Sequence, residues 1–149
     1  MRFLLFHGRG AISAAIRWQT RSHWSHAALL ISDDTIIEAW QGAGVRWKKI
    51  TDWENTKTFE VPTTEEQDEA ILTFARSKIG CRYDYRSVLR FVTRRKTGEN
   101  DKWFCSELVA ASFAAGGIDL FKRIDPAAIS PGMLELTPLA YGQYELGRP

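Results

Sequence analysis

The feature that most constrains this chain is an unbroken apolar segment, HAALLIS, at residues 26–32. A run of this length fits a β-strand that is buried on both faces. Asp33 and Asp34 follow as a turn, and TIIEAW at 35–40 resumes as a second strand, so residues 26–40 predict a β-hairpin. Such a hairpin belongs in the core of a sheet rather than at the surface.

Further strands and helices follow from the same kind of pattern. Strands are expected at residues 3–6, 45–50 and 57–61, and helices at 11–20, 65–80, 85–95 and 105–115, with short strands and turns in the tail. Strands come mainly before helices, which predicts an α+β protein whose antiparallel sheet packs against a helical layer. A length of 149 residues with 44% hydrophobic residues fits a single domain over residues 1–149.

Two of these helices carry more detailed expectations. The helix at 11–20 is expected to bury an apolar stripe that extends to Trp18. The helix at 65–80 is expected to start behind a side-chain cap at Thr63 or Thr64, with acidic residues in its first turn that complement the helix dipole.

Charge and composition exclude several classes of protein. The net charge is only +2, which argues against a dedicated nucleic-acid binder, and the one basic cluster, 94–96, fits a solvated helix end. The apolar stretch at residues 1–6 is too short for a signal peptide or a membrane span, so a cytoplasmic protein without an integral membrane segment is expected. The two cysteines, Cys81 and Cys105, are expected to be free thiols in that compartment.

Cys105 occupies a position that suits a nucleophile. It lies where a short loop opens into a helix, in the segment WFCSELVAASF. The first turn of a helix has a positive partial charge and unpaired N–H groups, which stabilise a thiolate and the oxyanion of a tetrahedral intermediate. Position alone fits a buried structural cysteine equally well.

A reactive cysteine needs a base, and the base needs an orienting partner. Of the three histidines, His26 begins the buried strand, where a base is held rigidly, whereas His7 and His23 fall in loops. Glu38 interrupts the second strand of the hairpin. If Glu38 lies opposite His26 across a turn near residue 32, the two side chains share one face of the sheet. The alternatives are a structural histidine and an exposed edge glutamate.

At this point the chain resembles the circularly permuted papain-like hydrolases of the NlpC-type superfamily, specifically the YiiX/YaeF-like branch, with lecithin retinol acyltransferase as a more distant relative. The resemblance covers about residues 2–137. Beyond the N-terminal strand and helix, the matching motifs are Ser25-His26-Ala27-Ala28 at a strand opening, EAWQGAGV from Glu38, Gly80-x-x-Tyr83-Asp84, Cys-Ser-Glu-Leu-Val at 105–109, and Ser130-Pro131. The histidine precedes the cysteine, the reverse of the papain order, which leaves the packed site intact because geometry and not chain order defines a triad.

The resemblance implies a role for each matching residue. Cys105 would be the nucleophile, His26 the general base and Glu38 the orienting residue. Tyr83 would line the oxyanion site, together with the backbone N–H of Cys105.

Three further residues, Ser25, Trp24 and Trp103, are substrate-binding candidates because they flank His26 and Cys105 in the sequence. The two tryptophans either wall the cleft or fill the core. Cys81 is expected to pack, with a redox partnership to Cys105 as the alternative.

The function implied is that of a cysteine amidase or peptidase that forms a thioester acyl-enzyme. Its substrate would be a small peptide, including cell-wall-type peptides, or a lipid-linked acyl group. An acyltransferase or thioesterase of the same fold and an inactive peptide- or lipid-binding module are the alternatives. No metal ion or cofactor is expected, because a site built from His23, His26 and a cysteine would lack the spacing of zinc sites.

Overall fold

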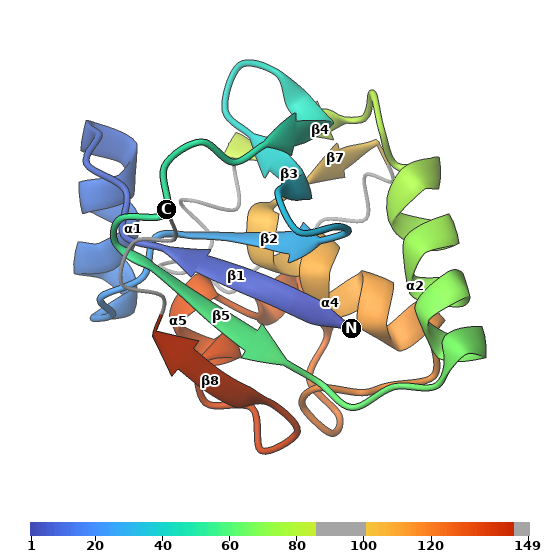
Figure 1. Ribbon diagram of the computed structural model, residues 1–149. Helices are drawn as coiled ribbons and strands as arrows, with labels where there is room; N and C mark the ends of the chain where they lie inside the picture. The colour runs from blue at the N-terminus through green and yellow to red at the C-terminus, as the bar shows by residue number, and fades with distance from the viewer. Residues whose placement is uncertain (86–100, 145–149) are drawn as a thin grey trace.

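The computed structural model describes residues 1–85 and 101–144, and its centre is a six-stranded antiparallel sheet (Figure 1). Every neighbouring pair of its strands runs antiparallel. The strand order is β4 (Gly44–Lys49), β3 (Thr35–Trp40), β2 (His26–Leu30), β1 (Arg2–Phe6), β5 (Thr56–Glu60) and β8 (Tyr141–Tyr144).

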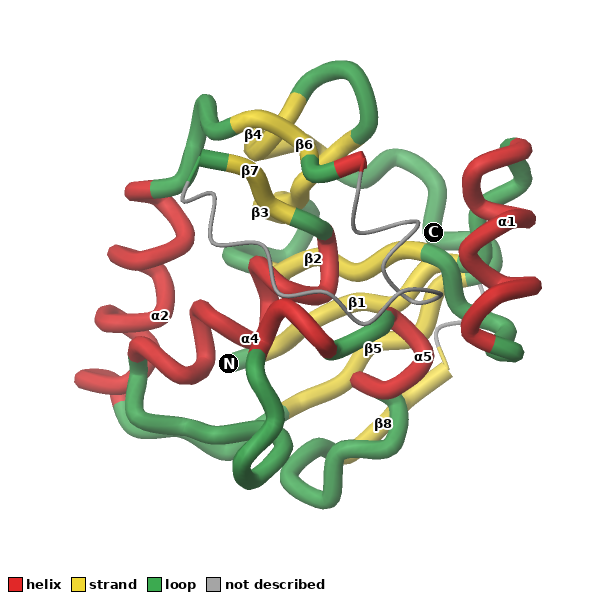
Figure 2. The backbone as a smooth tube through the Cα atoms, turned by 180° about the vertical axis from the view of Figure 1, so that it is seen from behind, coloured by secondary structure: helices red, strands yellow, loops and turns green. Residues whose placement is uncertain are grey.

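Helices cover one face of this sheet, as Figure 2 shows from behind. Helix α4 (Cys105–Ala115) packs on β2 and β3, and α2 (Glu65–Ser77) packs on α4. Helix α1 (Ala11–Thr20) lies at one end of the sheet, and a short helix α5 (Pro131–Leu134) follows a 3₁₀ turn at Pro126–Ala128. The α+β class and the antiparallel sheet against a helical layer are therefore confirmed.

Strand β2 is buried on both faces, which explains its unbroken apolar sequence. Ala27 and Leu29 belong to the main core, which continues into α4 and α2, whereas Ala28 and Leu30 join a second, smaller apolar cluster on the other face. Side chains alternate between the faces of a strand, so a strand with a core on each side has few positions for polar residues. The polar exception is His26, its first residue.

The hairpin of β2 and β3 forms as expected, but its predicted register was wrong by two residues. Leu29 lies opposite Ile37 and Leu30 opposite Ile36, and the N–H of Ile31 donates to the carbonyl of Thr35 at 2.8 Å. The turn is therefore centred on Asp33, one residue later than predicted. A two-residue shift preserves which side chains share a face, so the expectation for His26 and Glu38 survives the error.

Helix α2 begins as the sequence indicates, with Thr64 rather than Thr63 as its cap. The Thr64 hydroxyl accepts from the N–H of Gln67 at 3.3 Å, and the Gln67 side chain accepts from the N–H of Thr64 at 3.0 Å. In α1 only Ile16 is fully buried, while Trp18 is 81% exposed, so the expected stripe was too wide. This helix sits at the end of the sheet and has little surface to bury its apolar residues against.

The remaining expectations have mixed outcomes. The strands predicted at 45–50 and 57–61 each begin and end one residue earlier, and the helix predicted at 105–115 has those bounds. The helix predicted at 85–95 falls almost wholly on 86–100, outside the described residues. The tail contains the short helix α5, which was not expected, and ends in β8 at the sheet edge.

A small parallel pair, β6 (Arg82–Tyr83) and β7 (Lys102–Trp103), was not expected from the sequence. The segment before β6 lies against β4: the N–H of Val45 donates to the carbonyl of Cys81 at 2.8 Å, and the N–H of Gly80 donates to the carbonyl of Val45 at 2.9 Å. Because β7 ends just before α4, the pair brings Tyr83 beside the first turn of that helix.

None of the helices among residues 1–85 and 101–144 combines the length and the apolar character that crossing a membrane requires.

Candidate active site

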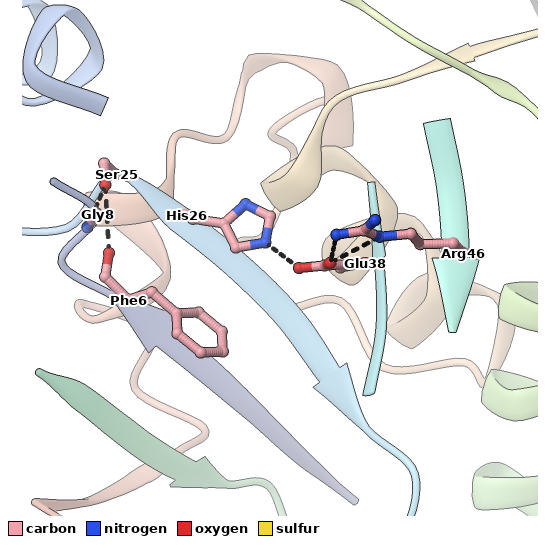
Figure 3. Close-up of polar contacts among 6 residues, drawn as sticks. All are labelled: Phe6, Gly8, Ser25, His26, Glu38 and Arg46. Atoms are coloured by element: carbon pink, nitrogen blue, oxygen red, sulfur yellow. Dashed lines mark hydrogen bonds and ion pairs between the residues drawn. The ribbon is translucent and has the colours of Figure 1, made fainter. Parts of the chain in front are cut away.

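His26 and Glu38 form a buried hydrogen-bonded pair (Figure 3). The His26 ring donates from Nε2 to Oε2 of Glu38 at 2.8 Å, and the residues are 8% and 2% exposed. Glu38 lies on β3 and His26 at the start of β2, on strands that neighbour each other in the sheet. A carboxylate at Nε2 fixes which ring nitrogen carries the proton, so Nδ1 is left as the basic nitrogen, on the side of the ring away from Glu38.

Cys105 is the first residue of α4 and is 1% exposed. Its side chain lies near enough to the His26 ring to raise the pKa of the imidazole. Neighbouring residues fix the helix start: the N–H of Phe104 donates to the Glu107 carboxylate at 3.2 Å, and the Ser106 hydroxyl donates to the carbonyl of Ile129 at 2.5 Å. The thiol therefore sits at the positive end of a firmly anchored helix, beside an imidazole.

The environment of His26 favours its protonated form. Burial lowers the pKa of His26, but the hydrogen bonds and charges of Cys105 and Glu38 outweigh that effect and raise the pKa from 6.5 to about 9. An imidazolium that is held between a carboxylate and a thiol stabilises the thiolate, which is the nucleophilic form of cysteine.

This shift predicts a pH-dependent stability. The folded protein holds the His26 proton more tightly than the unfolded chain, so the stabilisation is fully present below pH 6.5 and is lost as the pH rises toward 9. The free energy of unfolding should fall by up to about 3 kcal/mol over that range. Urea unfolding at several pH values measures it. A His26→Asn variant should show a smaller slope, and an unchanged slope would contradict the prediction.

Glu38 has a second partner that the sequence analysis missed. Arg46 on β4 lies directly opposite Glu38, and its guanidinium donates to Oε1 from Nε at 3.0 Å and from Nη2 at 2.8 Å. Burial works against ionisation of Glu38, but His26 and Arg46 outweigh it and hold the pKa of the carboxyl below its usual range. A buried carboxylate needs a partner, but His26 already met that need in the sequence analysis, and only the register of β3 with β4 places Arg46 opposite Glu38.

Two aromatic rings flank the His26 imidazole. The Phe6 ring lies 5.5 Å from it and the Trp40 ring 5.1 Å, the latter edge-on at 88°. The Trp40 ring also receives the Arg46 guanidinium at 5.4 Å from its centroid. These contacts limit the rotation of the imidazole, so its direction toward Cys105 is fixed by packing as well as by Glu38.

Tyr83 is buried beside Cys105, where the parallel pair of β6 and β7 brings it. Burial raises the pKa of the Tyr83 phenol, and the nearby charges of Cys105, Tyr85 and Asp84 raise it further. The hydroxyl therefore stays protonated at neutral pH and is a hydrogen-bond donor, as a group that stabilises an oxyanion must be.

Ser25, Trp24 and Trp103 make other contacts. The Ser25 hydroxyl accepts from the N–H of Gly8 at 2.9 Å and points away from Glu38 (Figure 3). The Trp24 indole donates to Glu135 at 2.8 Å within the core. Trp103 packs edge-on against Phe74 of α2. In the structure, Trp24 and Trp103 pack against neighbouring side chains, and Ser25 binds the loop backbone at Gly8.

The second thiol and the other two histidines make contacts of their own, and of these His7 also lines the pocket that opens onto His26 and Glu38. Cys81 packs against the main core, and both cysteines are free. The His23 ring lies against the His7 ring, with centroids 4.2 Å apart and the two planes tilted by 36°. Within residues 1–85 and 101–144, no group of three or more His, Cys, Asp or Glu side chains is placed to hold a metal ion.

A pocket of about 260 Å³ opens onto His26 and Glu38. It lies between the end of β1 and the segment that joins β4 to β5. Its other walls include aromatic, basic and acidic side chains, among them Phe6, Trp40, Arg9, Lys48, Asp52 and Glu54.

Comparison with known proteins agrees with this geometry. Residues 4–124 match the family described as permuted papain-like amidase enzymes, YaeF/YiiX, C92 family. A crystal structure of yiiX from Escherichia coli O157:H7, described as a metalloprotein, superposes with a TM-score of 0.73 at 17% identity, covering 95% of this chain and 94% of the other. Among curated proteins the search gave no match.

The structural likeness confirms the permuted papain-like fold, and the family match covers most of the chain. A permuted papain-like fold explains why the strand that begins with His26 comes before the helix that begins with Cys105 in this chain. The chain therefore belongs to the YaeF/YiiX family of permuted papain-like amidases and is a papain-like cysteine amidase.

Proposed function

We propose that this amidase works through Cys105 as nucleophile, His26 as general base and Glu38 as the residue that orients His26. The observation that supports it best is the arrangement around the imidazole. Nε2 is committed to Glu38 at 2.8 Å, and the Cys105 side chain interacts with the same ring. A nucleophile, a base and an orienting carboxylate in contact are the parts that covalent acyl transfer requires.

The proposed reaction has two halves. The Cys105 thiolate attacks the carbonyl carbon of the substrate, and the S–C bond forms as the carbonyl oxygen becomes an oxyanion. The Tyr83 hydroxyl and the backbone N–H of Cys105 donate hydrogen bonds to that oxygen. The C–N bond then breaks, and the His26 imidazolium gives its Nδ1 proton to the leaving amine.

The second half releases the acyl group. His26, now neutral, takes a proton from water, and the hydroxide attacks the thioester carbon. The C–S bond breaks, a carboxylic acid leaves, and the pair of Cys105 thiolate and His26 imidazolium is restored. We propose small peptides, including cell-wall-type peptides, and lipid-linked acyl groups as the substrates.

Selective alkylation tests the assignment of the nucleophile. Cys105 is buried and Cys81 is half-buried, so accessibility alone predicts that iodoacetamide modifies Cys81 first. Activation by His26 predicts the reverse order at pH 7, with Cys105 faster by about 10-fold or more, because only a thiolate reacts. Mass spectrometry of the peptides, sampled over time, measures both rates. If Cys81 reacts first, the proposed role of Cys105 is wrong.

A further inference from the structure

Arg46 divides the two oxygens of Glu38 between two partners. Both of its hydrogen bonds, at 3.0 and 2.8 Å, end on Oε1. Oε2 is thereby left to the Nε2–H of His26, at 2.8 Å. A carboxylate that is gripped from both sides keeps a single orientation, whereas one held by His26 alone is free to rotate about its last bond.

The burial of the Glu38 and Arg46 side chains differs in a way that suits this role. The Glu38 side chain is 2% exposed, but that of Arg46 is 35% exposed. Ionising Glu38 without a cation would be costly, because a buried charge loses its hydration. Arg46 supplies that cation and remains partly hydrated itself. Its guanidinium also rests on the Trp40 ring, which packs edge-on against His26.

We infer that Arg46 is a positioning residue of this active site: it keeps Glu38 ionised and turned toward His26, so that the basic nitrogen of His26 faces Cys105. The inference rests on the proposed roles of Cys105, His26 and Glu38 and adds a fourth member to them. Arg46 touches neither Cys105 nor a substrate in this assignment and acts only through Glu38.

The chemical consequence concerns acidic pH. If the site took up one more proton, Glu38 would keep the Nε2 proton of the imidazolium as its own O–H, and the added proton would go to the Cys105 thiolate. The ring would then be neutral with its one proton on Nδ1, where it neither accepts the thiol proton nor supplies a positive charge, so the ion pair of thiolate and imidazolium is lost. By holding Glu38 ionised, Arg46 extends the reactivity of Cys105 to lower pH.

Other charged groups around the site do not substitute for Arg46. The groups that act on the Glu38 carboxyl are His26 of β2 and Arg46 of β4. Lys49 also lies on β4, but its ammonium pairs with Asp34 at 3.3 Å and it does not line the pocket, which makes it a matched control. The further titratable groups that face the site are Cys105 of α4, Tyr83 of β6, and His7, Arg9, Lys48, Asp52 and Glu54 in the pocket.

The test is the pH profile of Cys105 alkylation. The rate with iodoacetamide is measured from pH 4 to 9 in a Cys81→Ser background, for Arg46→Met, Arg46→Lys and Lys49→Met. In Arg46→Met the midpoint of the acid limb should move up by at least about one pH unit, which slows alkylation about 10-fold near pH 5. Arg46→Lys should fall between Arg46→Met and the parent because it restores the charge but not the two-pronged contact. Lys49→Met should match the parent.

Two more variants make the result decisive. In a Glu38→Gln background, Arg46→Met should add no further shift, because the proposed effect passes through Glu38. An Arg46→Met profile that overlays the parent, or an equal shift in both backgrounds, overturns the inference. Should Arg46→Met fail to fold, Arg46→Lys and the double variant decide it by the same criteria. If His26→Ala also leaves the rate unchanged, the proposed function itself fails.

Discussion

Cys105→Ala should lower the hydrolysis of any substrate that this amidase turns over by at least about 10⁴-fold, because no other group replaces the thiolate. His26→Ala should cost a similar amount, since the thiol then has no base and no imidazolium beside it. The double variant should be no slower than either single variant, because residues that act as one unit lose their effect together. A screen of amide, ester and thioester substrates, with kcat/KM for each variant, measures this.

The matched control is Cys81→Ala, which removes the other thiol and leaves the site intact. It should retain kcat/KM within about 3-fold, the size of effect that one modest packing loss produces. Circular dichroism and the unfolding midpoint confirm that each variant is folded. Full activity in folded Cys105→Ala would contradict the assigned nucleophile. Product analysis in the same screen, with and without an added alcohol or amine acceptor, separates hydrolysis from acyl transfer.

Gly44→Ala should destabilise the protein by about 3 kcal/mol or more, because two costs add. Gly44 has φ of +71°, where a side chain is strained, and a Cβ there would collide with the carbonyl oxygen of Cys81. That carbonyl accepts the N–H of Val45, so the collision would push away the segment that leads to Tyr83. Urea unfolding measures the stability, and kcat/KM should fall as well.

Gly42 offers the control for this prediction. It has φ of +79°, close to that of Gly44, but a Cβ there meets nothing within 4 Å. Gly42→Ala should therefore cost only the backbone strain, about 1 kcal/mol, and leave Tyr83 in place. Equal losses in the two variants would show that strain alone matters and that the close approach of Cys81 does not.

The sequence predicted that His26 and Glu38 lie on the same face of the sheet, because this depends only on whether their residue numbers are both even or both odd. Both residues lie on one hairpin, and alternation puts residues of equal parity on the same face whether or not the register is known. The register itself failed, because the width of the turn around Asp33 decides it and the two aspartates suit more than one turn.

The contacts that cross between distant segments were less accessible. Tyr83 reaches Cys105 only through the short parallel pair of β6 and β7, whose two-residue strands leave no periodic pattern in the sequence. Arg46 was hidden for another reason: strand 45–50 contains several basic residues, and only the register of β3 with β4 shows which one lies opposite Glu38. Family resemblance supplied Tyr83, and nothing in the sequence analysis supplied Arg46.

The proposed base and the proposed nucleophile belong to different layers of the molecule. His26 and Glu38 lie in the sheet, while Cys105 is the first residue of α4, whose residues Leu108 and Val109 pack in the apolar core against the sheet. Hydrophobic packing keeps two layers together but tolerates small displacements more readily than a hydrogen-bonded strand pair does. A displacement of the helix by little more than an ångström would separate thiol from imidazole while every strand and helix persisted. The reactivity of Cys105 therefore reports how closely α4 packs against the sheet.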